Sequence, residues 1–193
     1  MWERHSHITR RRLLGGVVTV GIVGPGTAGC LGDDAEASVE SAPGPIALDD
    51  GRECDVCGMI IEGGYGPNGQ VVYDGDYPPE RGGPARYDSV RELYVDAFGQ
   101  MRRGIDPVAT FVTDYATVEF DVETQDGERY ITGSTEPETF VEAGDAVFVV
   151  DSGIRGAMGT DLLPFGRRDA AEAFVEEHGG EIVDGDVTAE LVE

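Results

Sequence analysis

The spacing of apolar residues predicts one amphipathic helix with short strands on either side of it. From Val90 to Met101 apolar residues recur at i, i+3, i+4, i+7, i+8 and i+11, which places them on one helix face. Asp88 or Ser89 is suited to cap this helix, and Gly104 to end it. Apolar runs and one alternating stretch predict strands at 59–61, 70–73, 108–113 and 117–123. Residues 57–73 are expected to form a hairpin, so that 51–124 becomes a ββαβ-type unit.

A second unit with a similar order is predicted over residues 125–193. Strands are expected at 129–132, 145–151 and 181–183, with an apolar segment at 158–165 and a helix from Asp169 to His178. Asp169 and Glu172 have the spacing of a capping box, and two glycines follow the helix. The pattern therefore predicts an α+β fold made of two related ββαβ-type halves.

Residues 1–29 have the organisation of an export signal. An arginine cluster precedes an uncharged stretch, Leu13–Gly29, that Pro25 interrupts and that is shorter than the roughly 20 residues of a membrane-spanning helix. The arginines resemble a twin-arginine signal, and Ala28-Gly29-Cys30 resembles a lipobox that would place a lipid on Cys30. Residues 30–50, rich in Asp, Glu, Ser, Pro and Gly, are predicted to be a flexible tether. The domain is thus expected at the extracytoplasmic face of the cell membrane.

The charge of the chain limits its partners. It has 38 acidic residues against 14 basic ones, all arginine, and a formal net charge of -24. This excess argues against nucleic acid, whose phosphates require basic patches. An acidic surface without lysine is typical of proteins that work in molar salt, where the Debye length falls to about 3 Å. We therefore expect an extreme halophile.

The chemistry concentrates in Cys54-Asp55-Val56-Cys57-Gly58-Met59, which places two thiols and a thioether within six residues. Thiolates and thioethers are the soft ligands that select Cu(I). If a strand begins at Cys57, alternation puts Cys57 and Met59 on one face, and a turn can bring Cys54 back toward them. A redox-active dithiol and a plain disulfide remain open alternatives. A structural zinc site is not favoured, because no second Cys-x-x-Cys is present.

Three further side chains are candidates with different roles. Met158 lies in a glycine-flanked loop and is a plausible additional copper ligand. Met101 lies on the apolar helix stripe and is assigned to the core. His178 ends the second predicted helix, where a capping or surface role is favoured over ligation. It is the one histidine left once the signal is removed, so no nucleophile–base pair stands out and an enzyme is not expected.

These residues carry a resemblance to the NosL family. The matching pieces run through most of 51–191 and comprise Cys54-Asp55-Val56-Cys57-Gly58-Met59, Val112-Thr113-Asp114-Tyr115, Ala157-Met158-Gly159, Pro164-Phe165, Ala173-Phe174 and Gly179-Gly180. The resemblance implies an exported, lipid-anchored Cu(I) protein that supplies copper during assembly of nitrous oxide reductase. It also implies two related halves, similar to the core of organomercurial lyases. The acidity and the Tyr77–Pro84 loop depart from the family.

The sequence therefore predicts a Cu(I) chaperone. The expected metal ligands are Cys57 and Met59, with Cys54 as the second thiol and Met158 as a supporting ligand. The expected partners are nitrous oxide reductase or its assembly machinery, and the membrane through Cys30. An exported thiol-disulfide oxidoreductase using Cys54 and Cys57 is the alternative.

Overall fold

The computed structural model describes residues 43–75, 77–79, 81–184 and 187–192. The predicted export signal, Cys30 and the tether up to residue 42 lie outside these residues. No helix within the described ranges is long and apolar enough to cross a membrane.

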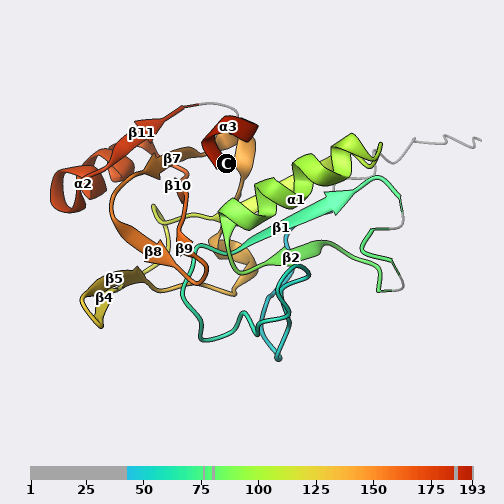
Figure 1. The fold of residues 1–193 in the computed structure, drawn as a ribbon, viewed down its shortest axis with the longest axis horizontal. Helices are drawn as coiled ribbons and strands as arrows, with labels where there is room; N and C mark the ends of the chain where they lie inside the picture. Colours follow the sequence, from blue (N-terminus) through green and yellow to red (C-terminus); the bar gives the residue numbers. More distant parts are fainter. Residues whose placement is uncertain (1–42, 76, 80, 185–186, 193) are drawn as a thin grey trace, which may run out of the picture. The chain divides into compact units, whose positions relative to one another are not determined.

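The first half of the described chain forms a ββαβ unit. Strands β1 (Gly69–Tyr73) and β2 (Ala85–Tyr87) pair antiparallel, helix α1 (Val90–Arg102) follows, and β3 (Pro107–Thr113) returns antiparallel to β1. A later strand, β6 (Phe140–Glu142), pairs with β3 and completes a sheet of order β2-β1-β3-β6. Figure 1 shows α1 lying along β1. The helix start at Ser89 agrees with the sequence prediction.

The second half repeats this connectivity with different residues. Strand β7 (Val147–Val150) lies between β10 (Leu163–Phe165) and β11 (Glu181–Val183), and both pairings are antiparallel. Helix α2 (Arg168–His178) connects β10 to β11. The central strands are β1 and β7. The strand before the helix, β2 or β10, lies on one side of the central strand, and the strand after the helix, β3 or β11, lies on the other side. The α+β fold class is therefore confirmed.

A third sheet contains segments from both sides of the predicted boundary at residue 124. Its order is β4-β5-β8-β9, where β4 and β5 form a hairpin that crosses that boundary. The remaining elements are β4 (Val122–Gln125), β5 (Glu128–Ile131), η1 (Pro137–Thr139), η2 (Ala143–Asp145), β8 (Ile154–Gly156), β9 (Gly159–Thr160) and α3 (Ala189–Val192).

The apolar stripe of α1 packs into the main core, with one exception. Val90 and Leu93 are buried in a cluster that includes residues of β1, β2 and β7, and Tyr94 and Phe98 pack against it. Met101, however, is 46% exposed, so its assignment to the core is wrong. It lines an open pocket with Phe98 of α1 and Val108 of β3. Periodicity gives the direction of a side chain, but it does not show whether another element covers that position.

Three local predictions are also wrong. Met59 and Ile60 are 42% and 59% exposed and form no strand with residues 70–73, because β1 pairs with β2 and β3 instead. Residues 117–123 alternate in burial as expected, but turns precede the regular strand, which begins at Val122. Helix α2 starts after Arg167 with no side-chain cap, so Asp169 and Glu172 do not form a capping box.

The last part of the predicted tether belongs to the folded domain. The backbone of Ile46 exchanges two hydrogen bonds with the Gln70 side chain, at 2.9 and 2.8 Å. The amide of Leu48 donates to the carbonyl of Thr135, and the Leu48 side chain is fully buried beside Cys54 and Ile61. Residues 46–48 thus belong to the folded domain, which fixes the chain a few residues ahead of the first thiol, and the tether stays a prediction for the residues before them.

Candidate metal site

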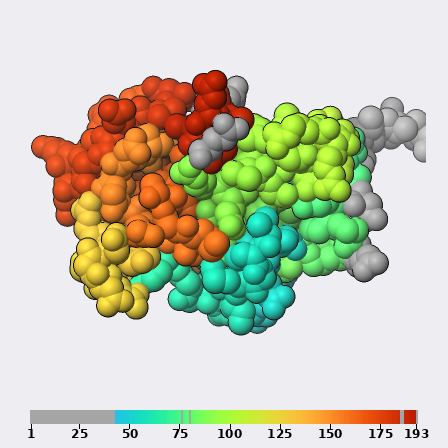
Figure 2. Space-filling model, in the orientation of Figure 1, coloured from blue at the N-terminus to red at the C-terminus, as the bar shows by residue number. Residues whose placement is uncertain are grey.

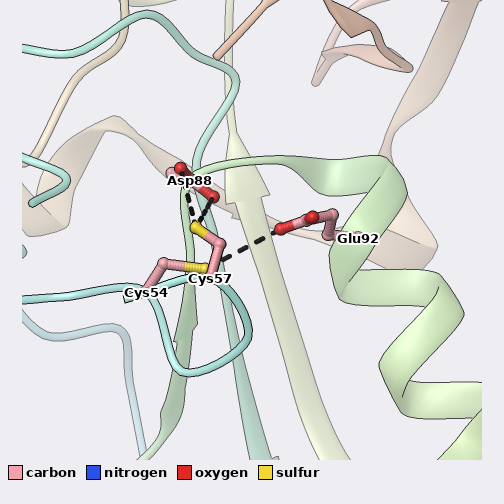
Figure 3. A group of neighbouring side chains, drawn as sticks. All are labelled: Cys54, Cys57, Asp88 and Glu92. Atoms are coloured by element: carbon pink, nitrogen blue, oxygen red, sulfur yellow. Dashed lines mark hydrogen bonds between the residues drawn. The ribbon is translucent and has the colours of Figure 1, made fainter. Parts of the chain in front are cut away.

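Residues 54–59 form a closed loop. The Cys54 amide donates to the Met59 carbonyl at 2.8 Å, and the Gly58 amide donates to the Cys54 carbonyl at 2.9 Å. Gly58 has φ +74°, a conformation that residues with a Cβ rarely adopt. The chain therefore turns back within six residues, and Figure 3 shows the two cysteine side chains meeting. No pleat is involved, so the predicted strand face shared by Cys57 and Met59 is wrong.

The loop is attached to strand β2. The Asp55 amide donates to the Arg86 carbonyl at 2.8 Å, and the Arg86 amide donates to the Asp55 carboxylate at 2.7 Å. Arg81 adds an ion pair to the same carboxylate at 2.6 Å. On the other side, Cys54 is 3% exposed and packs with Leu48 and Ile61. These contacts fix the loop beside the residue that follows β2, which is Asp88.

Two carboxylates from the start of α1 complete the cluster. Asp88 precedes the helix cap and Glu92 lies in the first turn. The Cys57 thiol donates to the two Asp88 oxygens at 3.6 and 3.4 Å, and the Cys54 thiol donates to Glu92 Oε2 at 3.9 Å. One donor atom from each of these four residues lies within 4.8 Å of the others (Figure 3). The structure therefore brings together two sulfur and two oxygen donors.

The surroundings favour the protonated thiols when no metal is bound. Burial raises the pKa of Cys54 to about 12, although backbone amides of Cys57 and Asp88 partly oppose this shift. Burial is also the main cause of the raised pKa of Cys57, and the nearby Asp88 carboxylate adds to it. Burial and the Asp88 charge likewise raise the pKa of Glu92. A metal ion that binds the thiols must therefore displace protons.

The two predicted methionine ligands occupy different positions around this cluster. Met59 ends the thiol loop and is 42% exposed. Met158, in the turn between β8 and β9, is 46% exposed and lines a pocket of about 490 Å³ together with Val56 and Glu92. The second half of the chain thus contributes a thioether to the pocket that adjoins the thiol loop.

The sequence did not reveal the two carboxylates. Asp88 and Glu92 are separated from their cysteine partners by 31 and 38 residues, and acidic residues at a helix start are usually explained by the helix dipole. In a chain with 38 acidic residues no carboxylate pair stands out. The one available signal was that Asp88 is one of the two candidates for the helix cap.

His178 lies apart from the four donors. Its ring packs against Phe174 at 4.6 Å between centroids, and its Nε2 is 3.8 Å from Glu177. It lines a second cavity, of about 540 Å³, with Tyr115 and Phe165. The assignment of His178 to a surface or capping role remains a prediction.

The donor set fits a soft metal ion. Cys54 and Cys57 are free thiols, so both sulfurs are available. Two thiolates suit a monovalent soft ion, whereas the added carboxylates also suit a divalent ion such as zinc. A paired-thiol site on an α+β domain of two ββαβ units is consistent with a metal-binding protein.

Comparison with known proteins identifies the family. The NosL family model matches residues 45–192, and the chain belongs to this family. The copper-binding lipoprotein NosL of Stutzerimonas stutzeri is 28% identical over 172 residues, which cover 89% of this chain and 78% of that protein. The crystal structure of the copper chaperone NosL from Shewanella denitrificans has a TM-score of 0.58 at 25% identity, covering 76% of this chain and 96% of that one. The resemblance inferred from the motifs is thus confirmed.

Proposed function

We propose that this protein is an exported, lipid-anchored Cu(I) chaperone that delivers copper to nitrous oxide reductase during its maturation. The observation that carries the proposal is the pair of free thiols held in one closed loop. Relatives of the same family are described as a copper-binding lipoprotein and a copper chaperone. Lipid attachment at Cys30 accounts for the anchor, and the extracytoplasmic face of the membrane for the location.

Copper is the cargo, and four sulfur groups are proposed to hold it. Cys57, Cys54 and Met59 come from the loop, and Met158 supports them from the β8–β9 turn. Soft sulfur ligands favour Cu(I) over harder ions, and a site with few ligands releases its ion by exchange with an incoming ligand. In the structure the thiols donate hydrogen bonds to Asp88 and Glu92, and the ion would replace these hydrogen atoms on the two sulfurs.

The alternative, a thiol-disulfide oxidoreductase, receives no support from the electrostatics. Such enzymes need a cysteine whose pKa is lowered toward neutrality, commonly at a helix N-terminus. Here burial raises the pKa of Cys54 to about 12 and also raises that of Cys57. The cysteines lie in a loop, and the acidic residues beside them, Asp88 and Glu92, accept hydrogen bonds from the thiols.

An anaerobic Cu(I) titration tests the binding step. The reduced protein should bind one Cu(I) per chain, and the double variant Cys57→Ser, Met59→Ala should lose most of the affinity. Met158→Ala should weaken binding to a smaller degree. Met101→Ala is its matched control, because Met101 is also 46% exposed but lines a different pocket. A double variant that binds Cu(I) as tightly as the parent would falsify the ligand assignment.

A transfer assay tests the delivery step. Cu(I)-loaded protein is mixed with copper-free nitrous oxide reductase, and the copper content of each is measured after separation. The proposal expects copper to reach the reductase faster than from an equal amount of a Cu(I)–chelator complex. Equal rates from both donors would contradict a dedicated carrier.

A further inference from the structure

Exposed apolar side chains gather around the thiol loop. The large apolar residues that are exposed in the described part of the chain number seven. Val56, Met59 and Ile60 belong to the loop or adjoin it, and Val95 and Met158 line the pocket that Val56 also lines. The other two, Met101 and Val108, line the separate pocket between α1 and β3. Most of these exposed large apolar side chains thus lie next to the candidate metal site.

The pocket beside the loop, which we call the exchange pocket, has walls from three segments. It has a volume of about 490 Å³ and is lined by Val56 of the loop, Val95 of α1 and Met158 of the β8–β9 turn, among others. These segments, cyan, green and orange, meet on the face shown in Figure 2. Glu92 belongs both to this pocket and to the donor cluster. A side chain that fills the exchange pocket therefore lies next to the thiols.

The charged residues that line this pocket are Arg91 and two acidic residues, Glu92 and Asp96. Arg91 lines the pocket, and its guanidinium forms no ion pair with any residue that the structure describes. Only some of the arginines that the structure describes are paired, among them Arg81 and Arg86 with Asp55, and Arg168 with Glu172. An unpaired guanidinium in a chain with 38 acidic residues is suited to bind a carboxylate from outside.

We propose, building on the function proposed above, that the exchange pocket docks the protein with which copper is exchanged. The partner inserts an apolar side chain between Val56, Val95 and Met158, and places a carboxylate against Arg91. Apolar side chains that are buried at the centre of an interface supply most of its binding energy, and a charge at the rim fixes orientation and speeds encounter. Docking at this place brings the partner's own metal ligands to the thiol loop.

Matched variants separate docking from copper binding. Val95→Asp puts a charge into the exchange pocket, and Val108→Asp is its control, because Val95 and Val108 are 51% and 52% exposed but lie in different pockets. Arg91→Gln removes the docking charge, with Arg102→Gln in the last turn of α1 as its control. Each variant is assayed for Cu(I) affinity, for copper loss to a small chelator, and for transfer to copper-free nitrous oxide reductase.

All four variants should keep the Cu(I) affinity and the rate of loss to the chelator. Val95→Asp should slow transfer to the reductase by about tenfold, the effect expected for one central interface side chain, and Arg91→Gln by a smaller factor that salt reduces. Both controls should transfer like the parent. Normal transfer by Val95→Asp, or equal slowing by Val108→Asp, would overturn the docking site while leaving copper carriage intact.

Two other results have distinct meanings. If the parent chain binds no Cu(I), the proposed function itself is overturned. If it binds Cu(I) but does not pass the ion to the reductase, both the reductase as recipient and the docking site are overturned. A dimer that dissociates on dilution and is lost in Val95→Asp but kept in Val108→Asp would show that a second copy occupies the exchange pocket. That outcome would replace the partner proposed here.

Discussion

The two ββαβ units differ most where the second strand meets the helix. In the first unit β2 leads to α1 through Asp88 and Ser89, and in the second β10 leads to α2 through Gly166 and Arg167. The Asp88 carboxylate faces Cys57, whereas Gly166 has no side chain and its amide donates to Asp114 Oδ1 at 2.6 Å. The same topology therefore carries candidate metal donors at the junction of one unit and no such donor at the matching residues of the other.

The two units also differ because only the first has the thiol loop beside its junction. Residues 54–59 precede the first unit and attach to β2 through Asp55 and Arg86. At the second junction a Cβ on Gly166 would come within 2.7 Å of the Asp114 carboxylate, so even a small side chain has no room there. The site thus depends on the residues at one junction and on an added loop, and the fold alone does not produce it.

Each unit also holds the start of the other unit's helix. Asp161, just before β10, accepts a hydrogen bond from the Arg91 amide in the first turn of α1 at 2.8 Å. Asp114, just after β3, accepts one from Gly166 ahead of α2. Each helix start is therefore held by a carboxylate from the other unit. The position of Asp88 and Glu92, at the start of α1, thus depends on Asp161 from the second half.

The largest expected effect comes from Asp161→Asn, which tests this exchange. Asp161 is fully buried, and burial raises its pKa from 3.8 to about 7. As the pH rises from 4 to 7, the unfolded chain loses this proton while the folded chain keeps it. The free energy of unfolding therefore falls over this pH range. At about 1.4 kcal/mol per pKa unit, the loss at pH 7.5 is on the order of 4 kcal/mol.

Asn retains the oxygen that accepts from the Arg91 amide but does not ionise. The free energy of unfolding of parent and variant, measured in urea at pH 4 and pH 7.5, should therefore be similar at pH 4 and favour the variant at pH 7.5. If the difference in the free energy of unfolding between variant and parent is the same at both pH values, this explanation is contradicted.

The next effect tests the chemistry of the first junction. Asp88→Asn with Glu92→Gln removes the hard oxygen donors and makes this junction more like the second one. We expect the affinity for zinc to fall at least about tenfold, as for changes in the immediate surroundings of a metal, while Cu(I) affinity changes less. Competition titrations with each ion measure this, and an equal loss for both ions would show that the carboxylates do not distinguish them.

A third change tests the crowding at the second junction. Gly166→Ala forces a methyl group against Asp114 and should lower the free energy of unfolding by about 2 kcal/mol, within the usual range for overpacking. Gly144→Ala serves as the control, because a Cβ there meets no atom within 4 Å. Similar denaturation midpoints for Gly166→Ala and the parent would show that the junction can relax.

The smallest effects concern the two helix caps. The Ser89 hydroxyl accepts from the Glu92 amide at 3.1 Å, whereas Arg167 makes no side-chain cap. Ser89→Ala should cost about 1 kcal/mol of unfolding free energy, and Arg167→Ser should add a few tenths. Thermal unfolding of both variants measures this, and a gain in stability for Ser89→Ala would rule out the capping role.

Local patterns in the sequence predicted much of the fold. The stripe from Val90 to Ala97 located α1, and the repeated order of strands and helix gave the ββαβ layout, because both depend on neighbouring residues. The same rules failed at Met59 and Ile60, whose apolar side chains are exposed in the loop rather than buried in a strand. Residues that serve an exposed surface do not follow the burial pattern on which such rules depend.

The site was predicted only in part for a related reason. Two sulfurs in one short motif are visible in the sequence, so Cys54 and Cys57 could be identified. Asp88 and Glu92 reach them only because Asp55 attaches the loop to β2, a contact between residues 31 positions apart. That pairing has no local signature, and neither does the approach of Met158 to the exchange pocket.

The unequal exposure of the two thiols implies an order of events. Cys54 is enclosed by Leu48 and Ile61, whereas Cys57 faces solvent. With both thiols as copper ligands, as proposed above, an approaching donor or acceptor would meet Cys57 first, and the bond to Cys54 would form last on loading and break last on release. In the proposed handover the enclosed sulfur would therefore retain the ion, which would keep free copper out of the surrounding solution.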